Sequence, residues 1–266
     1  DDSKIYVVDS GNHRVQIFGE GASTLDHVLA LSSSSNGKVD GISFQDEDIL
    51  RYDPVADQWA MLFDGSDVGV GKADLDAFAL LPDGSILMSF DKGIKFPHLG
   101  TVDDSDIVRF LPQQLGSNTS GVFELMFDGS AVGLTADGED IDAIALDWNA
   151  NALLISTAGT AKVPGVEGQD EDLLAFTPLV TTPTPGAWSL FFDGSAVKLT
   201  AGNEDVTAAA LDEDGKLYLA TKGKFSALSL SAIQGDNNDI FGCTLCGSGL
   251  NTTACTFFAL FDGDVA

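Results

Sequence analysis

The sequence predicts an all-β fold, a β-propeller built from repeated four-stranded blades. Three observations predict it. The motif Phe-Asp-Gly recurs at Phe63, Phe127, Phe192 and Phe261, with spacings of 64, 65 and 69 residues. Each copy contains short apolar runs with the length of strands, and no stretch sustains the 3.6-residue period of an amphipathic helix. A fixed period of this kind is typical of stacked copies of one supersecondary unit, none of which buries its apolar face alone.

The first two runs of each copy are joined by a short turn. The first run is rich in Ala, which suits a crowded innermost strand, and turns such as Pro82-Asp83-Gly84 tolerate the positive φ that tight hairpins need. The first runs are 26–31, 76–80, 142–146 and 207–211, and the second runs are 85–90, 152–157 and 216–221.

The third run follows an acidic start, and the fourth run is aromatic and ends at Phe-Asp-Gly. The third runs are 48–52, 106–110, 172–176 and 239–241, and the fourth runs are 59–63, 123–127, 188–192 and 257–261. Four short antiparallel strands per period describe one propeller blade. The period exceeds the ~40–50 residues of common propeller repeats. We assign the excess to two loops, of which 159–170 and 129–139 are examples.

The opening segment differs from the other copies. Residues 4–18 read Lys-Ile-Tyr-Val-Val-Asp-Ser-Gly-Asn-His-Arg-Val-Gln-Ile-Phe, which resembles the middle two strands of an NHL propeller repeat. From Leu25 onward the chain resembles the long tandem propeller repeats, rich in Phe-Asp-Gly-Ser and Asp-Glu-Asp-Leu, of uncharacterised bacterial exported proteins. The first resemblance implies a propeller as well. The second implies an extracellular or cell-surface location and carries no activity with it.

These signals predict one domain over 1–266, with a partial blade at 1–24 and four long repeats at 25–266. The ring is four- or five-bladed, depending on whether the opening strands join a full copy. An incomplete blade exposes a strand edge, which is a template for pairing. Either the ends pair within the chain, or they pair head to tail with a neighbouring copy.

The 266-residue chain is strongly acidic, with 13 Lys and Arg against 41 Asp and Glu and a net charge of −28. This balance excludes nucleic acid as a partner and disfavours an anionic membrane. It favours cations or basic partners, or else a solvated surface that maintains solubility. No apolar run approaches the ~20 residues of a membrane span, so we expect no membrane insertion. The sequence opens without Met, as a processed or truncated form would.

Carboxylates recur at fixed places in the repeat, at the starts of the first and third strands and at the end of the fourth. Because strands alternate in direction, these places share one rim of the ring, and oxygen-rich loops are what Ca²⁺ prefers. A plainer interpretation is that these carboxylates cap turns and solvate the rim. The candidate calcium ligands are Asp64, Asp74, Asp76, Asp128, Glu139, Asp140, Asp142, Asp193, Glu204 and Asp205.

Three cysteines, Cys243, Cys246 and Cys255, lie close together. A redox Cys-x-x-Cys motif expects a βαβ context, and a zinc site needs a fourth ligand, so a disulfide within this segment is favoured. One cysteine is then free or paired between molecules. Two glycosylation triplets begin at Asn118 and Asn251 and weakly favour an exported protein.

No catalytic signature stands out. The Gly-x-Ser-x-Gly elbow is absent, and the serine of Phe-Asp-Gly-Ser repeats, which favours a structural turn. The leading hypothesis is therefore a non-enzymatic extracellular propeller that binds a partner or assembles with itself and is stabilised by calcium. The alternative is a calcium-dependent propeller enzyme of the lactonase, lyase or glycosidase kind, with carboxylates at the central channel.

Overall fold

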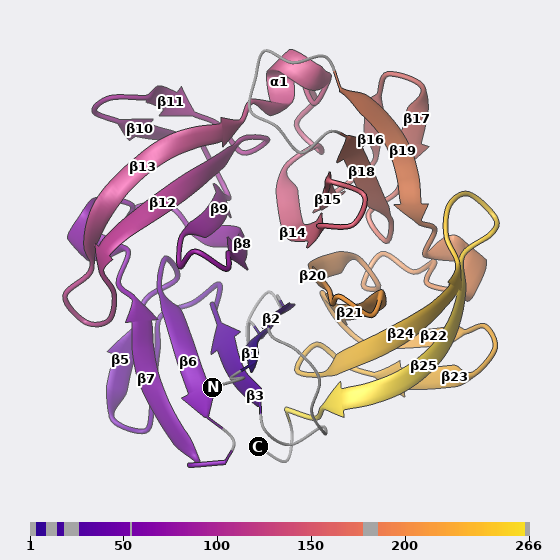
Figure 1. Cartoon of the computed structure of the whole chain (residues 1–266), viewed down its shortest axis with the longest axis horizontal. Coiled ribbons are helices and arrows are strands. Elements are labelled where there is room, and N and C mark those ends of the chain that lie inside the picture. The colour runs from indigo at the N-terminus through magenta and orange to yellow at the C-terminus, as the bar shows by residue number, and fades with distance from the viewer. Residues whose placement is uncertain (1–3, 9–14, 19–26, 54, 178–185, 264–266) are drawn as a thin grey trace.

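The computed structural model describes residues 4–8, 15–18, 27–53, 55–177 and 186–263, and it describes side chains from Leu29 onward. Four sheets stand around a common axis, each with one edge toward the centre and the other at the periphery (Figure 1). The predicted all-β propeller is confirmed, and the ring has four blades.

Blades 2, 3 and 4 each contain four antiparallel strands in chain order from the inside outward. The strands are β8 (Leu75–Leu80), β9 (Ile86–Phe90), β12 (Ile107–Gln114) and β13 (Ser120–Phe127) in blade 2; β14 (Ile141–Asp147), β15 (Ala152–Thr157), β18 (Leu173–Thr177) and β19 (Ala187–Phe192) in blade 3; and β20 (Val206–Leu211), β21 (Lys216–Thr221), β24 (Ile240–Gly247) and β25 (Ala254–Phe261) in blade 4.

Blade 1 has a different inner edge. Its order is β2 (Val15–Phe18), β1 (Lys4–Val8), β3 (His27–Leu31), β6 (Ile49–Asp53) and β7 (Gln58–Phe63). The opening strands thus join the first copy and do not form a fifth blade. β1 pairs with β3 in parallel, and β2 is one strand further in, near β8, β20 and β21 (Figure 1).

The expectation that 26–31 is a first strand is wrong. β3 pairs with β6, as each second strand pairs with the third strand of its blade, and the first-strand place belongs to β1. The Ala-rich pattern misled the assignment because β3 carries a buried Ala30 like those of true first strands.

A small hairpin stands between the second and third strands of every blade, where the sequence predicted a loop. These hairpins are β4 (Gly37–Val39) with β5 (Ile42–Phe44), β10 (Ile94–Phe96) with β11 (Gly100–Val102), β16 (Ala161–Val163) with β17 (Val166–Gly168), and β22 (Phe225–Leu228) with β23 (Ala232–Gly235).

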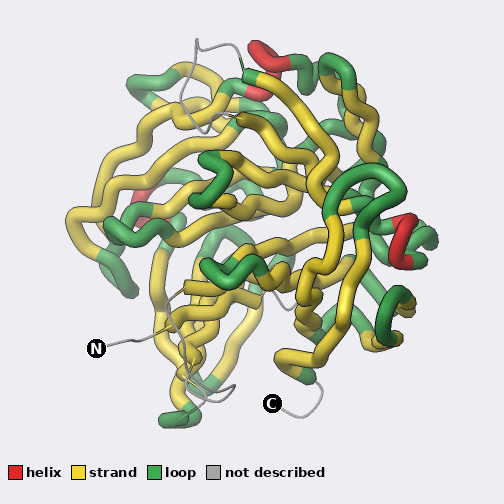
Figure 2. The backbone as a smooth tube through the Cα atoms, turned by 45° about the vertical axis from the view of Figure 1, so that its right-hand side comes forward, coloured by secondary structure: helices red, strands yellow, loops and turns green. Residues whose placement is uncertain are grey.

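The second predicted loop follows Phe-Asp-Gly and connects each blade to the next; we call it the connector. In blades 1 to 3 it opens with one helical turn: η1 (Ser66–Val68), α1 (Gly129–Val132) and η2 (Ser195–Val197). Figure 2 shows helix confined to such short segments. In the described part of the chain, none of the helices has the length and apolar character to cross a membrane.

The core explains the sequence pattern. Ala residues on β8, β14 and β20 are fully buried, because the inner strands of neighbouring blades approach closely, which confirms the crowding inferred from their size. Blades 1 and 4 meet through side-chain packing of Leu29, Leu31 and Tyr52 against Ala208, Tyr218 and Ile240. Among the strands that the structure describes, no sheet combines the two ends of the chain.

Candidate functional site

The Phe-Asp-Gly aspartates cap the connectors. Asp193 Oδ1 accepts hydrogen bonds from Ser195 Oγ at 2.8 Å and the Ala196 amide at 3.0 Å, and its Oδ2 accepts one from the Asn251 amide at 2.6 Å. Burial alone would raise the pKa of Asp193, but these bonds hold it below its ordinary value. Asp128 caps α1 in the same way, and Asp64 accepts from Ser66 Oγ.

The aspartate just before each third strand accepts a hydrogen bond from the amide of the Phe-Asp-Gly glycine of the same blade. Asp172 accepts hydrogen bonds from the amides of Gln169 and Gly194, both within 2.9 Å. Asp48, Asp106 and Asp239 repeat both contacts in their own blades. This bond ties the start of the third strand to the end of the fourth, so it is a structural clamp in every blade.

Glu139 and Glu204 join a connector to the next hairpin. Glu204 Oε2 accepts from the amides of Thr200 and Ala201 at 2.7 and 2.8 Å, and Oε1 accepts from the Ser226 amide of β22 at 2.8 Å. Glu139 makes the equivalent bonds to Thr135, Ala136 and Lys162. Both predicted ligands therefore have their oxygens occupied by backbone amides.

The remaining predicted ligands lie at the starts of the inner strands: Asp74, Asp76, Asp140, Asp142 and Asp205. Two of them meet across the boundary between blades 3 and 4. The side chain of Asp205 is 1% exposed and lies 3.2 Å from Lys222 Nζ, and the Asp142 carboxyl is near enough to affect the pKa of Asp205. Burial raises the pKa of Asp205 to about 6, although Lys222 opposes the shift. We call Asp142, Asp205 and Lys222 the inner-rim cluster.

The predicted ligands are thus divided among several places. Among the residues that the structure describes, no group of three or more His, Cys, Asp or Glu side chains is arranged to hold a metal ion. Consecutive blades approach closely at this rim, since the Val206 amide, which opens β20, donates to the Asp170 carbonyl of blade 3.

Two further carboxyl groups were not among the predicted ligands. Glu47 and Glu171 follow Asp46 and Asp170 and are almost fully buried, and the carboxyl of the preceding aspartate lies beside each of them. Burial, reinforced by that neighbouring carboxyl, raises the pKa of Glu47 to about 7 and that of Glu171 to about 8. The recurring Asp-Glu-Asp triplet was the available signal.

A cavity of about 310 Å³ lies between blades 1 and 4, and we call it the seam cavity. It is lined by Leu31, Ser32, Ser33, Lys38, Val39, Phe44, Asp48, Leu50, Trp59, Asn238, Phe261 and Gly263. Its wall combines aromatic and aliphatic side chains with a few polar groups, which is the usual composition of a ligand site. Sequence reasoning missed it because the lining comes from both ends of the chain.

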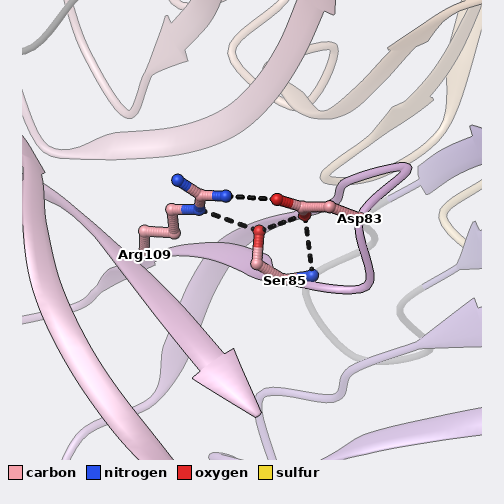
Figure 3. Close-up of polar contacts among 3 residues, drawn as sticks. All are labelled: Asp83, Ser85 and Arg109. Atoms are coloured by element: carbon pink, nitrogen blue, oxygen red, sulfur yellow. Dashed lines mark hydrogen bonds and ion pairs between the residues drawn. The ribbon is translucent and has the colours of Figure 1, made fainter.

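A polar cluster of Asp83, Ser85 and Arg109 lies at the turn between β8 and β9 (Figure 3). The described residues of the other blades form no equivalent cluster. Arg109 donates to Ser85 Oγ at 2.9 Å and to Asp83, and Asp83 accepts from the Ser85 hydroxyl at 2.6 Å. The pKa of Asp83 is lowered, and the hydrogen bond from the Ser85 hydroxyl is the largest cause. The three groups satisfy one another, so the cluster fixes the predicted Asp83-Gly84 turn.

The structure joins Cys243 to Cys255 and leaves Cys246 exposed as a free thiol. The bond links β24 to β25, the two outer strands of blade 4. The predicted glycosylation triplets mark loops that reach the preceding blade: Thr119 and Thr253 accept through Oγ1 from the amides of Asp64 and Asp193, both at 2.9 Å.

Removing the disulfide should destabilise the protein by about 3 kcal/mol, the cost expected for opening a loop of ~15 residues. The bonded residues are 12 positions apart. The measurement is urea denaturation of Cys243→Ala with Cys255→Ala. Cys246→Ala is the matched control and should match the unmodified protein; equal midpoints for all three proteins would contradict the prediction.

No protein-family model matches the chain, and no curated protein sequence matches it significantly. Among solved structures, it is similar to YCF48 from Cyanidioschyzon merolae (11% identity, TM-score 0.35), covering 92% of this chain and 60% of that one. It is also similar to a PQQ-bound aldose sugar dehydrogenase from Streptomyces coelicolor (13% identity, TM-score 0.37), covering 89% of this chain and 86% of that one. A third similar structure is a proposed gluconolactonase (13% identity, TM-score 0.34), covering 93% of this chain and 79% of that one. Similarities of this size do not identify an activity, and the resemblance to NHL repeats stays a prediction.

Proposed function

We propose that this protein is a non-enzymatic binding propeller that works outside the cell or on its surface, and that a partner docks in the seam cavity. The seam cavity carries the proposal, because it places Trp59, Phe44 and Phe261 around a space large enough for a few side chains. A structural role for many of the recurring carboxylates is supported by Asp172, Asp193 and Glu204, whose oxygens accept backbone hydrogen bonds.

An extracellular location is supported by the Cys243–Cys255 disulfide, because such bonds persist in oxidising compartments. The strongly acidic composition supports a basic or cationic partner.

A neutral apolar dye tests the seam cavity. Nile red should bind saturably at one molecule per protein, and Val39→Trp, which places an indole in the lining, should weaken that binding at least tenfold. Val122→Trp is the matched control, because Val122 is 52% exposed on blade 2 and is not part of the lining. Absence of saturable binding, or equal loss in both variants, would refute the cavity as a binding site.

We propose that calcium, when it binds at the inner-rim cluster, stabilises the fold. Asp142 and Asp205 are neighbouring buried carboxyls, but Lys222 neutralises one charge there and Ca²⁺ takes six to eight oxygens. The described side chains therefore supply only part of a calcium site.

Binding of calcium would stabilise the fold by about 2.7 kcal/mol at a hundredfold excess over Kd. We expect a higher melting temperature in calcium than in chelator at equal ionic strength, and a smaller gain in Asp142→Asn with Asp205→Asn. Identical melting curves in calcium and in chelator would contradict calcium binding, and the carboxylates of the inner-rim cluster would then have no role as metal ligands.

The inner-rim cluster also favours one second candidate, a calcium-dependent propeller enzyme. A carboxyl whose pKa is raised to about 6 beside a lysine suits proton transfer. Against it, β2 extends blade 1 toward the centre of the ring, where such a site would open. Hydrolysis of simple lactones that is lost in Asp205→Asn would favour the enzyme over the binding propeller.

A further inference from the structure

The outer part of blade 4 carries almost no charge. Residues 225–261, which include β22, β23, β24 and β25, contain two charged side chains, whereas the whole chain contains 13 basic and 41 acidic ones. The two are Asp236 and Asp239, which are half-buried just before β24 and accept hydrogen bonds from backbone amides there. We call the solvent-exposed side of these four strands and their turns the neutral face (Figure 1).

The neutral face carries exposed leucines. Leu228 and Leu230 are 53% and 65% exposed at the turn between β22 and β23, and Leu250 is 67% exposed on the loop between β24 and β25. They are three of the six large hydrophobic side chains that are exposed where the structure describes side chains. Scattered apolar residues are ordinary on a protein surface, but apolar residues gathered on one surface mark a contact site.

Backbone contacts bring these residues to the same end of blade 4. The Leu230 amide donates a hydrogen bond to the Cys255 carbonyl at 3.0 Å, and Cys255 pairs with Leu245 of β24. The next residue is Cys246, the exposed free thiol, and Leu250 lies in the loop that joins the two strands. The β22–β23 turn, the free thiol and this loop therefore form one surface.

The β22–β23 turn also covers the outer edge of β25. Ser229 Oγ accepts a hydrogen bond from the Cys255 amide at 3.1 Å, and Ser231 Oγ accepts one from the Phe257 amide at 2.5 Å. The edge of an outer strand is otherwise a template for pairing with another strand. Because the turn occupies these amides, a partner at the neutral face binds through side chains and does not add a strand.

We propose that the neutral face is the interface of a two-fold symmetric dimer of this protein. Charge favours a second copy as the occupant. A basic partner would bind an acidic surface more strongly, whereas two copies of net charge −28 can meet at the neutral face with most of their charge away from the contact. In a two-fold dimer both copies use the same patch, and an uncharged apolar patch is complementary to itself.

The neutral face is large enough for a dimer. A standard interface covers ~800 Å² on each partner, which is a patch roughly 28 Å on a side. β24 and β25 have eight residues each, so each strand is ~27 Å long at ~3.4 Å per residue. The uncharged surface also continues onto blade 3, because β19 has no charged residue and the Gly249 amide donates to the Phe191 carbonyl at 2.9 Å.

Sedimentation equilibrium of the full chain tests the dimer. Association should strengthen severalfold as salt rises from ~0.1 M to ~1 M, because the Debye length falls from ~10 Å to ~3 Å and the repulsion between two acidic copies is screened. Leu230→Asp with Leu250→Asp should weaken association at least tenfold. Val55→Asp with Val122→Asp is the matched control, which adds the same two charges at valines that are 69% and 52% exposed on blades 1 and 2. It should weaken association much less.

The free thiol gives a second readout. Alkylation of Cys246 by a maleimide should slow severalfold once the protein concentration exceeds the Kd, because the dimer covers this thiol, while Cys243 and Cys255 are bonded to each other. Unchanged alkylation in the dimer would place the contact on another surface and overturn the inference.

Three other outcomes also overturn the dimer. They are a monomer at millimolar concentration, an association that weakens with salt, and equal weakening in the two double variants, each checked for a native circular dichroism spectrum. Binding of monomers to phosphatidylcholine vesicles that is lost in the leucine variant would assign the neutral face to a lipid surface instead. The seam cavity is tested separately, since its lining contains none of Leu228, Leu230 and Leu250.

Discussion

Gly129→Ala should lower the free energy of unfolding by about 3 kcal/mol, at the upper end of the cost of inserting a methyl group into a packed site. A Cβ at this position would lie 2.1 Å from the Ser105 carbonyl oxygen, which is backbone and cannot rotate away. To relieve this clash the backbone at residue 129 must move away from Ser105, which would lengthen the hydrogen bond from the Gly129 amide to Asp106. For a chain of this size, the melting temperature should fall by roughly 6–12 °C.

Gly202→Ala is the matched control, because a Cβ there meets no atom within 4 Å. It should change stability by no more than ~0.5 kcal/mol. Asp106→Asn, alone and combined with Gly129→Ala, shows whether the two effects share a cause, since substitutions acting through one hydrogen bond are less than additive. A Gly129→Ala protein as stable as the Gly202→Ala protein would contradict the close approach seen in the structure.

Stability should fall as the pH rises from 5 to 9 in the presence of chelator. Glu47 and Glu171 have folded-state pKa values raised by burial to about 7 and about 8, from an ordinary value of 4.5. Groups with raised values bind protons on folding, so their contribution is complete below about pH 4.5 and is lost as the pH passes 7 and 8. At 1.36 kcal/mol per unit of pKa, the full loss is on the order of 3 kcal/mol for Glu47 and 5 kcal/mol for Glu171.

Urea denaturation at pH 5, 7 and 9 measures this loss. Glu47→Gln with Glu171→Gln removes these two titrations while keeping side chains of similar size, so its stability should change less over the range. Asp106 and Asp205, whose pKa values burial raises to about 6, still titrate in both proteins and account for the remaining slope. Asp193 does not interfere, because its pKa is lowered and its contribution is lost only as the pH falls below about 4. A midpoint that is constant or rises with pH would show that these carboxyls are not buried as described.

The repeat period made the architecture predictable, because Phe-Asp-Gly performs the same task in blades 1 to 3. Its Phe packs in the core, its Asp caps the connector, and its Gly approaches the chain before the third strand. A residue type that recurs for one physical reason leaves a strong signal in a single sequence.

The site was much less predictable. The inner-rim cluster and the seam cavity both lie between blades, so their members come from different repeats and share no local pattern. The hairpins were missed because each strand has only three or four residues, too few to show alternation. The calcium prediction relied on carboxylates that recur on one rim. Some of them, such as Glu204, accept hydrogen bonds from backbone amides, and calcium binding itself stays a prediction.

The contiguity of the blades has a consequence for how such a protein can change its length. Each blade is made from one continuous range of the sequence, and in the part of the chain that the structure describes no sheet combines β1 with β25. Duplicating or deleting the coding sequence of one period would therefore add or remove a whole sheet without cutting any other. What would resist a change in copy number is the inner edge, where Ala77, Ala143 and Ala209 are sized for a ring of four.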